Sequence, residues 1–228
     1  IIYKEIKNKI KEDDQSVPYF LNGYWYLTKY QKNKNYPVYL RRKSDLNSKD
    51  QILFDCNLLA EGYEYFNLSN IKISPNNKFA AYSIDTLSRR LYTIRIKNLQ
   101  TGEVLNDQII NTSGGFAWAN DNKTLFYTNR DSDTLRNDKI LRHEIGTKSK
   151  DDKIVFHEKD NTFYTSVSKS KSNKFIIISS HSTLTSEFQF LDANKPSDNF
   201  RLFNQRKRGL EYSINHYEKF FYIITNID

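Results

Sequence analysis

The side chains best suited to chemistry are few and scattered along the sequence. The histidines are His143, His157, His181 and His216, and the one cysteine is Cys56. A zinc site would need two histidines four residues apart on a helix, or histidines paired with cysteines, and neither pattern occurs. We therefore predict no metal site and no cofactor. We expect the histidines to be surface residues or hydrogen-bonded residues of the core.

The nucleophile motif of the α/β-hydrolases is also missing from the sequence. No serine stands in a Gly-x-Ser-x-Gly motif, which would place it on the sharp turn of an α/β-hydrolase. Cys56 is predicted to be a small apolar residue of a strand. A single cysteine excludes an internal disulfide and suits a reducing compartment. The sequence thus predicts no catalytic residue in this chain.

Two charged clusters could bind a ligand or another charged group. Asp131, Asp133 and Asp138 form a carboxylate-rich loop, but it lacks the Gly and terminal Glu of an EF-hand, so we expect a solvated loop. Arg89 and Arg90 follow a predicted strand. They would line a channel, bind a neighbouring carboxylate or form a surface ion pair.

The net charge of +8 raises the question of nucleic-acid binding. The lysines are spread along predicted loops and strand ends, and the one dense cluster is Arg206, Lys207 and Arg208. We expect this cluster to lie in a solvated loop before Gly209, and we predict no nucleic-acid partner.

All of these residues must be positioned by a repeated strand–turn–strand pattern. Residues 116–130 read FAWANDNKTLFYTNR, with aromatic and apolar residues on both sides of a turn rich in Asn and Asp. Such residues suit a half-buried strand, and Asn and Asp tolerate the left-handed backbone of a tight turn. Residues 71–85, 166–182 and 212–228 repeat the pattern, and residues 17–31 are a looser copy.

The period of this repeat predicts the fold. The turn lysines Lys78, Lys123, Lys174 and Lys219 stand 45, 51 and 45 residues apart. A four-stranded propeller blade takes about 40–50 residues. Aromatic residues make up 14% of the chain, with only 7 Gly and 4 Pro, which indicates strands rather than disorder. We predict an all-β fold, a β-propeller of four-stranded antiparallel blades, about four and a half of them in this chain.

The predicted organisation begins with residues 1–16, a lead-in helix or connector, because Ile2, Ile6 and Ile10 share one helical face. The partial propeller follows at residues 17–228. Its blades are predicted at about 17–67, 68–113, 114–164, 165–210 and 211–228.

The last predicted blade has only two strands, which would leave an unpaired edge and an uncovered blade face. Either the domain continues or the chain self-associates through its open edges. No apolar run approaches the roughly 20 residues of a membrane span, and no signal-peptide pattern is present, so we predict no membrane partner. Residue 1 is Ile and the chain has no Met, so we expect an excised piece of a longer protein.

Several stretches carry a family resemblance. They are VPYFLNGY (17–24), DTLSRRLY (85–92), FAWANDNK (116–123), RHEIGT (142–147), FHEKDNTFY (156–164), TSEFQFLD (185–192) and EYSINHY (211–217). Together, and in this order, they resemble the oligopeptidase B group of the prolyl oligopeptidase family of serine peptidases. The resemblance implies a seven-bladed propeller that caps an α/β-hydrolase domain, and that domain would hold the Ser-Asp-His triad.

The resemblance also implies a function. The parent protein would be a serine oligopeptidase that cleaves short peptides after Arg or Lys, and the propeller would restrict access to the triad. The partners would be peptide substrates, reached through the hydrolase domain, and that domain itself. This chain alone is expected to be inactive. A cytoplasmic location is expected, with the periplasm as the alternative.

One site is implied by the same resemblance. Ser16 (in QSVPY) and Glu64 (in GYEYF) match positions that face an arginine of the hydrolase domain. A carboxylate that grips a guanidinium across a domain boundary is strong when partly desolvated. The alternative is that both residues are ordinary polar residues of loops.

A second function class stays open. The chain could be a free-standing propeller that acts as a protein- or ligand-binding scaffold. The Trp-Asp dipeptide of WD40 repeats is missing, which argues against that subclass. A reading frame that ends near Asp228, or continues without Gly-x-Ser-x-Gly, would favour the scaffold.

Overall fold

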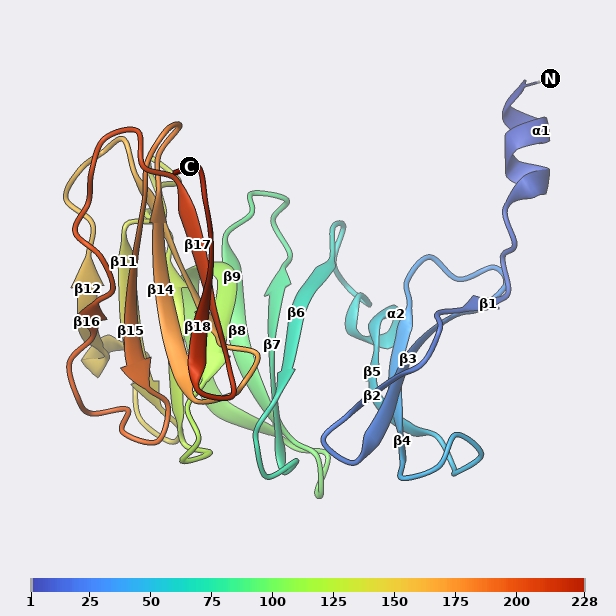
Figure 1. Cartoon of the computed structure of the whole chain (residues 1–228). Coiled ribbons are helices and arrows are strands. Elements are labelled where there is room, and N and C mark those ends of the chain that lie inside the picture. The colour runs from blue at the N-terminus through green and yellow to red at the C-terminus, as the bar shows by residue number, and fades with distance from the viewer. Residues whose placement is uncertain (1, 228) are drawn as a thin grey trace. The chain divides into compact units, whose positions relative to one another are not determined.

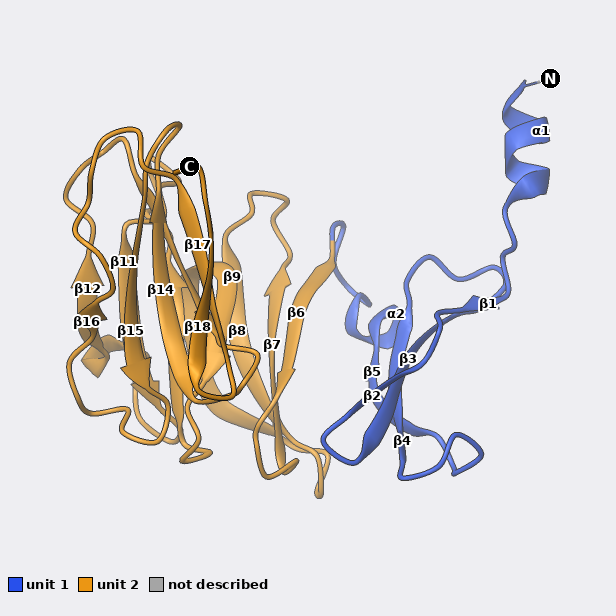
Figure 2. Ribbon diagram, in the orientation of Figure 1, with its two compact units in different colours: residues 1–65 blue, residues 66–228 orange. Residues whose placement is uncertain are grey.

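The computed structural model describes residues 2–227 and is built almost entirely of antiparallel strands (Figure 1). The predicted all-β class is therefore confirmed. The chain divides into two compact units, Ile1–Tyr65 and Phe66–Asp228 (Figure 2). In the described part of the chain, no helix has the length and apolar character to cross a bilayer.

Unit 1 holds one sheet and two short helices. Its sheet has the order β1-β3-β4-β5, and β2 pairs with β3. The elements are α1 (Ile2–Lys9), β1 (Asp14–Gln15), β2 (Tyr19–Leu21), β3 (Tyr24–Tyr30), β4 (Val38–Lys43), β5 (Gln51–Asp55) and α2 (Cys56–Leu59). Its core is small and consists of Leu27, Val38 and Leu40.

One detail of unit 1 differs from expectation. Cys56 begins helix α2 instead of lying in a strand, because the side chain of Asp55 accepts from the amide of Asn57 and caps the helix. At the N-terminus, α1 is a helix, and its apolar residues are exposed: Ile2, Ile6 and the following Ile10 are 72%, 58% and 62% exposed.

Unit 2 consists, in chain order, of β6 (Asn67–Ile73), β7 (Phe79–Asp85), β8 (Tyr92–Asn98), β9 (Val104–Trp118), β10 (Thr124–Asn129), β11 (Lys139–Glu144), η1 (Ser149–Asp151), β12 (Lys153–His157), β13 (Tyr164–Lys169), β14 (Phe175–His181), β15 (Ser186–Asp192), β16 (Arg201–Leu202), β17 (Tyr212–Tyr217) and β18 (Phe220–Thr225). These strands form a seven-stranded sheet β12-β11-β10-β9-β8-β7-β6, a four-stranded sheet β13-β14-β15-β16 and the pair β17-β18.

Strand β9 joins two four-stranded repeats into the seven-stranded sheet. Its first part pairs with β8 up to Thr112, and its last part, from Thr112 to Trp118, pairs with β10. The region forms one continuous strand, which bends where Asn111 and Gly114 take positive φ values of 54° and 83°. A Cβ on Gly114 would lie 3.1 Å from the ring of Tyr92, so this bend requires glycine.

The repeated turns share one backbone conformation. The residue before each turn lysine lies in the left-handed region, with φ of 61° at Asn77, 63° at Asn122, 60° at Asn173 and 53° at Glu218. Asn is among the residues that adopt this region readily. The turn chemistry predicted from the sequence is thus confirmed in unit 2, and Glu218 is the unfavourable copy.

The core of unit 2 consists of layers between successive repeats of strands. Successive residues of one strand point to opposite faces of the sheet, so they pack against different neighbouring repeats. On β10, Leu125 and Tyr127 pack in a cluster with Ile94 and Ile96 of β8. Phe126, between them, packs toward Ile176 and the sheet of β13 to β16.

The next layer follows the same rule. Ile177 of β14 faces away from its neighbours Ile176 and Ile178 and packs with Phe188, Tyr212 and Ile214. The sheet of β13 to β16 is thus buried between its two neighbours along the chain, which is the packing of propeller blades.

Candidate functional site

In each repeat of unit 2, one turn joins the first strand to the second. These turns lie at the same end of unit 2, which is its lower side in Figure 1, and hydrogen bonds link neighbouring repeats there. We call this the turn end, and define it by residues 74–78, 119–123, 170–174 and 217–219. The amide of Asn76 donates to Oδ1 of Asn122 over 2.7 Å. One repeat further, Nδ2 of Asn120 donates to the carbonyl of Asn173 over 3.0 Å.

The third link at this end joins residues 170–174 to the end of β17, just before the last turn. The amide of Lys171 donates to Oδ1 of Asn215 over 3.0 Å, and the amide of Ser172 donates to the carbonyl of His216 over 3.1 Å. Nδ1 of His216 also lies 2.8 Å from Oγ of Ser172. The Ser172 hydroxyl also accepts a hydrogen bond from the amide of Lys174, so we assign it a structural role in the turn and not the role of a nucleophile.

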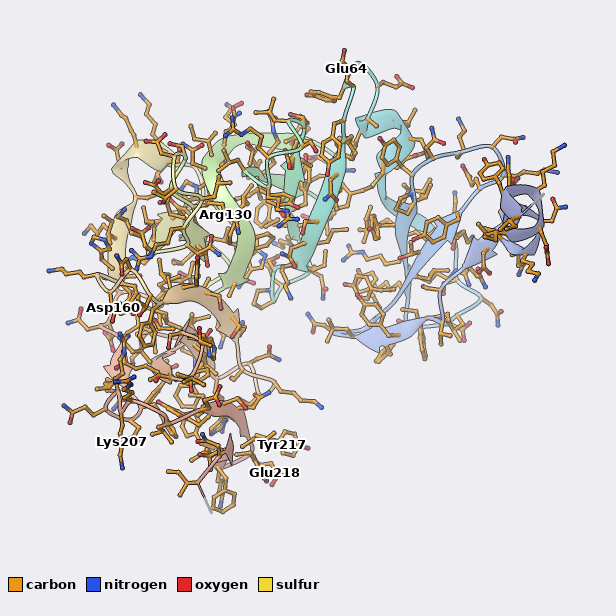
Figure 3. All side chains as sticks on the ribbon, turned by 90° about the horizontal axis from the view of Figure 1, so that it is seen from above. Glu64, Arg130, Asp160, Lys207, Tyr217 and Glu218 are labelled. Carbon is orange, nitrogen blue, oxygen red and sulfur yellow. The ribbon has the colours of Figure 1, made fainter. Side chains whose placement is uncertain are left out.

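The opposite end of unit 2 is held by arginines. We call it the arginine end, and define it by the contacts of Arg130, Arg136 and Arg206; Figure 3 looks down on it and labels Arg130, Asp160 and Lys207. Nη1 of Arg130 donates to the carbonyl of Arg90 over 2.9 Å, which joins the loop after β10 to the loop after β7.

Arg136 and Arg206 converge on the segment between β12 and β13. Arg136 donates to the carbonyls of Phe163, Glu158 and Asp160, at 3.2 and 3.0 Å for the first two. Asp160 also has a lowered pKa, chiefly through the hydrogen bond from the hydroxyl of Thr162. The segment is therefore fixed by its main chain.

The Arg206 guanidinium contacts three side chains at once. Its Nη2 lies 2.6 Å from Oε2 of Glu158 and 3.2 Å from Oε1 of Glu187, and its Cζ lies 3.7 Å from the ring centre of Phe163. Glu158 is only 5% exposed. The expectation of a solvated loop is thus wrong for Arg206, although Lys207 and Arg208 are exposed.

Other sequence candidates take structural roles. Arg89 and Arg90 form no ion pair with any described residue, so the surface ion pair considered for them is not found. Asp131 accepts from the amides of Asp133 and Thr134 and shapes its own loop. Within residues 2–227, no three His, Cys, Asp or Glu side chains gather as metal ligands would.

The histidines and Cys56 also show no catalytic arrangement. His143 is fully buried and hydrogen-bonded, as expected for a core histidine, and His216 is 5% exposed. His157 lies 3.5 Å from a carboxylate oxygen of Asp138. Burial, followed by the charge of Asp55, raises the pKa of Cys56 to about 12, so its thiol stays protonated at neutral pH.

Ser16 and Glu64, the two residues implied by the resemblance, both lie in unit 1. Ser16 follows β1, where its amide donates to the carbonyl of Thr28 and its Oγ accepts from the Thr28 amide at 3.0 Å. Glu64 is exposed in the bend between α2 and β6, and it makes no hydrogen bond or ion pair with any described residue. No direct contact joins the two side chains.

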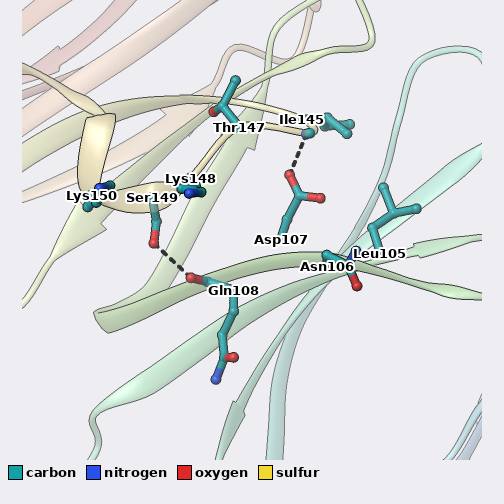
Figure 4. A pocket seen from close by; sticks show the side chains of 10 residues that line it. Leu105, Asn106, Asp107, Gln108, Ile145, Thr147, Lys148, Ser149 and Lys150 are labelled. Carbon is teal, nitrogen blue, oxygen red and sulfur yellow. Dashed lines mark hydrogen bonds between the residues drawn. The ribbon is translucent and has the colours of Figure 1, made fainter.

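A hollow of about 780 Å³ lies between the start of β9 and the loop before η1 (Figure 4). It is lined by residues 105–108 and 145–150. Two hydrogen bonds cross between its walls: the Gly146 amide donates to Oδ1 of Asp107 over 2.6 Å, and Oγ of Ser149 donates to the carbonyl of Gln108 over 2.9 Å. Sequence reasoning did not single out this loop as a site.

The whole chain, residues 1–228, matches the family model described as "Prolyl oligopeptidase, N-terminal beta-propeller domain". It is 37% identical over its full length to dipeptidyl aminopeptidase BI of Pseudoxanthomonas mexicana, of which it covers 33%. It is 31% identical over 99% of its length to protease 2 of Moraxella lacunata, of which it covers 34%. The chain therefore spans about a third of the length of these relatives.

Solved structures agree with the sequence match. Oligopeptidase B from Leishmania major superposes over 99% of this chain and 32% of its own, with a TM-score of 0.94 at 29% identity. A closed form of oligopeptidase B from Trypanosoma brucei, with covalently bound antipain, superposes over the full chain and 32% of its own, with a TM-score of 0.91 at 27% identity. The antiparallel repeats of unit 2 are thus repeats of a propeller.

Proposed function

The chain belongs to the prolyl oligopeptidase family as its N-terminal β-propeller domain, and from this premise we propose that it is the substrate-gating part of a longer serine oligopeptidase similar to oligopeptidase B. The match of the whole chain to oligopeptidase B of Leishmania major, with a TM-score of 0.94, is the observation that carries the proposal. In this proposal the Ser-Asp-His triad lies in an α/β-hydrolase domain outside these residues.

The proposed mechanism of the propeller is steric. A ring of blades around a channel admits flexible peptides and rejects folded proteins, so it protects other proteins from the triad. Such a ring must resist separation of its blades. The hydrogen bonds between neighbouring repeats at both ends of unit 2 support this role.

The proposed substrates are short peptides cleaved after Arg or Lys. The similarity to oligopeptidase B and to protease 2 supports this choice. The acidic groups that would select a basic side chain are assigned to the hydrolase domain, and the propeller would set the size of the substrate.

We propose further that Ser16 and Glu64 face an arginine of the hydrolase domain. Glu64 is exposed and has no partner among residues 2–227, so its carboxylate is available to a guanidinium. Ser16 is fixed to Thr28 through its main chain and hydroxyl, which would give the contact a defined position.

The open edge supports a proposal of self-association for the chain on its own. Among residues 2–227, β18 pairs only with β17, and it exposes Phe220, Tyr222 and Ile224 at 64%, 56% and 78%. A free strand edge with apolar side chains is a site for strand pairing with a second copy. Sedimentation at rising concentration tests this: dimers or larger species are expected, and a monomer at every concentration overturns it.

The organisation and location are proposed as follows. Residues 1–16 lead into one partial propeller at residues 17–228, with repeats at the boundaries predicted from the sequence. The protein is proposed to be cytoplasmic, and its single, buried and unpaired Cys56 suits a reducing compartment.

The experiment compares this chain with the product of the complete reading frame. The purified chain is expected to cleave no Arg–amide or Lys–amide substrate. The complete protein is expected to cleave short peptides after Arg and Lys, to spare folded proteins and to be inhibited by antipain. Cleavage by the isolated chain, or no peptidase activity in the complete protein, overturns the proposal.

The interdomain contact is tested in the complete protein with Glu64→Gln and Ser16→Ala. Loss of the carboxylate is expected to lower kcat/KM several-fold and to increase proteolytic sensitivity between the domains. Glu61→Gln is the matched control, because Glu61 is also exposed and lies three residues away. Equal effects of the substitutions at Glu61 and Glu64 would contradict the proposed interdomain contact but not the proposed peptidase function.

A further inference from the structure

His143 sits between two carboxylates with no access to water. Its side chain, on β11, is 0% exposed, and those of Asp107 and Asp152 are 4% and 2% exposed. Nε2 lies 2.9 Å from Oδ1 of Asp107, and Nδ1 lies 2.8 Å from Oδ1 of Asp152. Both ring nitrogens are therefore committed to acidic partners.

The two short contacts require two protons. An ionised carboxylate only accepts hydrogen bonds, and a neutral imidazole has a single N–H donor. A neutral ring between two carboxylates would thus turn one lone pair toward an oxygen at hydrogen-bond distance. The imidazolium donates to both carboxylates at once and satisfies the observed geometry.

The groups around the cluster favour the charged ring. Tyr127 of β10 donates its hydroxyl to Oδ2 of Asp152 over 3.0 Å, and the amide of Gly146 donates to Oδ1 of Asp107. Within residues 2–227, neither carboxylate forms an ion pair with a lysine or arginine. The ring of His143 is therefore the cation that faces both acids.

The cluster joins parts of unit 2 that belong to different repeats. Asp107 lies on β9 where it pairs with β8, whereas His143 and Asp152 flank the loop before β12. The same loop forms one wall of the hollow, and the bond from Gly146 crosses to the other wall (Figure 4). Loss of the imidazolium would remove the link that joins Asp107 of β9 to His143 and Asp152 on either side of this loop.

We propose that protonated His143 is a pH-operated latch that holds the loop of residues 145–150 against β9. The latch is closed while the ring donates to both Asp107 and Asp152. It opens when the ring loses one proton, because one nitrogen then faces a carboxylate without a hydrogen between them. The ring carries the only proton lost in this step, and no bond other than N–H breaks.

The direction of the pH dependence follows from the surroundings. Burial alone would lower the pKa of His143, but the hydrogen bonds and charges of Asp152 and Asp107 outweigh it and raise that pKa above its ordinary value. A raised histidine pKa adds stability that is fully present below the unfolded value of about 6.5. That stability is lost as the pH rises through the folded value, so the latch opens on the alkaline side.

The test is a titration of the ¹⁵N-labelled full chain by NMR. Two N–H protons are expected on His143 at pH 7, with loss of one above that pH. The protection factor of the Gly146 amide against hydrogen exchange is expected to fall at least about 10-fold with the same midpoint. The proposal is overturned if His143 carries a single N–H at pH 7. It is also overturned if the protection factor of the Gly146 amide does not change at the titration midpoint of His143.

Two variants separate the latch from general stability. Asp152→Asn keeps the shape but removes one charge, and it is expected to move the His143 midpoint down by about 1 unit or more. His157→Gln, at the exposed histidine of β12, is the matched control and should leave the Gly146 profile unchanged. An Asp152→Asn protein that folds and keeps the original midpoint contradicts the proposal, even if His143→Gln fails to fold.

Discussion

Neighbouring repeats are joined at both ends of unit 2, but by different kinds of side-chain contact. At the turn end, neighbouring repeats are joined mostly by main-chain amides and uncharged side chains, as in the bond from Asn76 to Asn122, and the lysine ammonium groups there donate to uncharged oxygens, as Lys169 does to Asn120. At the arginine end they are joined by guanidinium groups, and Arg206 bridges two carboxylates. The links described at the turn end are hydrogen bonds to uncharged oxygens, whereas Arg206 at the arginine end forms ion pairs with Glu158 and Glu187.

The difference predicts how each end responds to substitution. A neutral contact contributes about 0.5–1.5 kcal/mol, and its loss leaves at most one polar group unpaired. A buried charge that loses its partner costs several times more, because the remaining charge stays away from water. The arginine end should therefore be the more sensitive of the two, although it holds fewer contacts.

The largest effect is expected at Arg206. Arg206→Met keeps the side-chain stem but leaves Glu158 and Glu187 without their cation, so we expect a loss of about 3–5 kcal/mol in urea unfolding. Lys207→Ala, at the exposed neighbour, should change stability by less than about 0.5 kcal/mol. Adding Glu158→Gln to Arg206→Met should restore part of the loss; if the two losses simply add, the clamp is not a coupled unit.

A smaller loss is expected at Arg136. Arg136→Ala removes the donors to the carbonyls of Glu158, Asp160 and Phe163, and we expect a loss of about 2–3 kcal/mol in the same assay. Arg136→Lys supplies one cation without the planar fork, so it should recover less than half of the loss. Full recovery by lysine would show that charge, and not the geometry of the fork, holds this segment.

The turn end should respond less, and Asn120 is its best test. Asn120→Ala removes the bonds from Nδ2 to Asn173 and Asn194 and leaves the ammonium of Lys169 without its 2.6 Å acceptor. We expect a loss of about 1–2 kcal/mol. Asn106→Ala, at an exposed asparagine, is the control. A loss at Asn120 as large as that at Arg206 would remove the distinction between the ends.

The smallest effect is expected at Glu218 and has the opposite sign. Glu218→Asn places the residue of the other three turns at a φ of 53°, so we expect a gain of about 0.5–1 kcal/mol. Thermal unfolding should shift upward by about 1–4 °C. Lys219→Asn, at the next residue, is the control and should give no gain. Unchanged stability at Glu218 would mean that its backbone is not strained.

The turn end could be predicted from the sequence and the arginine end could not. Turns repeat because each must reverse the chain between two buried strands, and only a few residues adopt the left-handed conformation this needs, so Asn recurs at positions 77, 122 and 173. Arg136 and Arg206, in contrast, do not belong to a pattern that repeats at a fixed spacing along the sequence. The sequence predicts a solvated Arg206, because no local pattern shows that Glu158 and Glu187 lie beside it in the fold.

The sequence by itself determined the strands, the turns and the repeat of 45, 51 and 45 residues, since alternation and turn chemistry act over a few neighbouring residues. The resemblance it carries to a peptidase propeller is confirmed. Only the tertiary structure decided that β9 runs through two repeats, that Arg206 is clamped, and that His143 lies between Asp107 and Asp152. These contacts join residues 9 to 48 positions apart, and burial sets their strength, which only the packed sheets define.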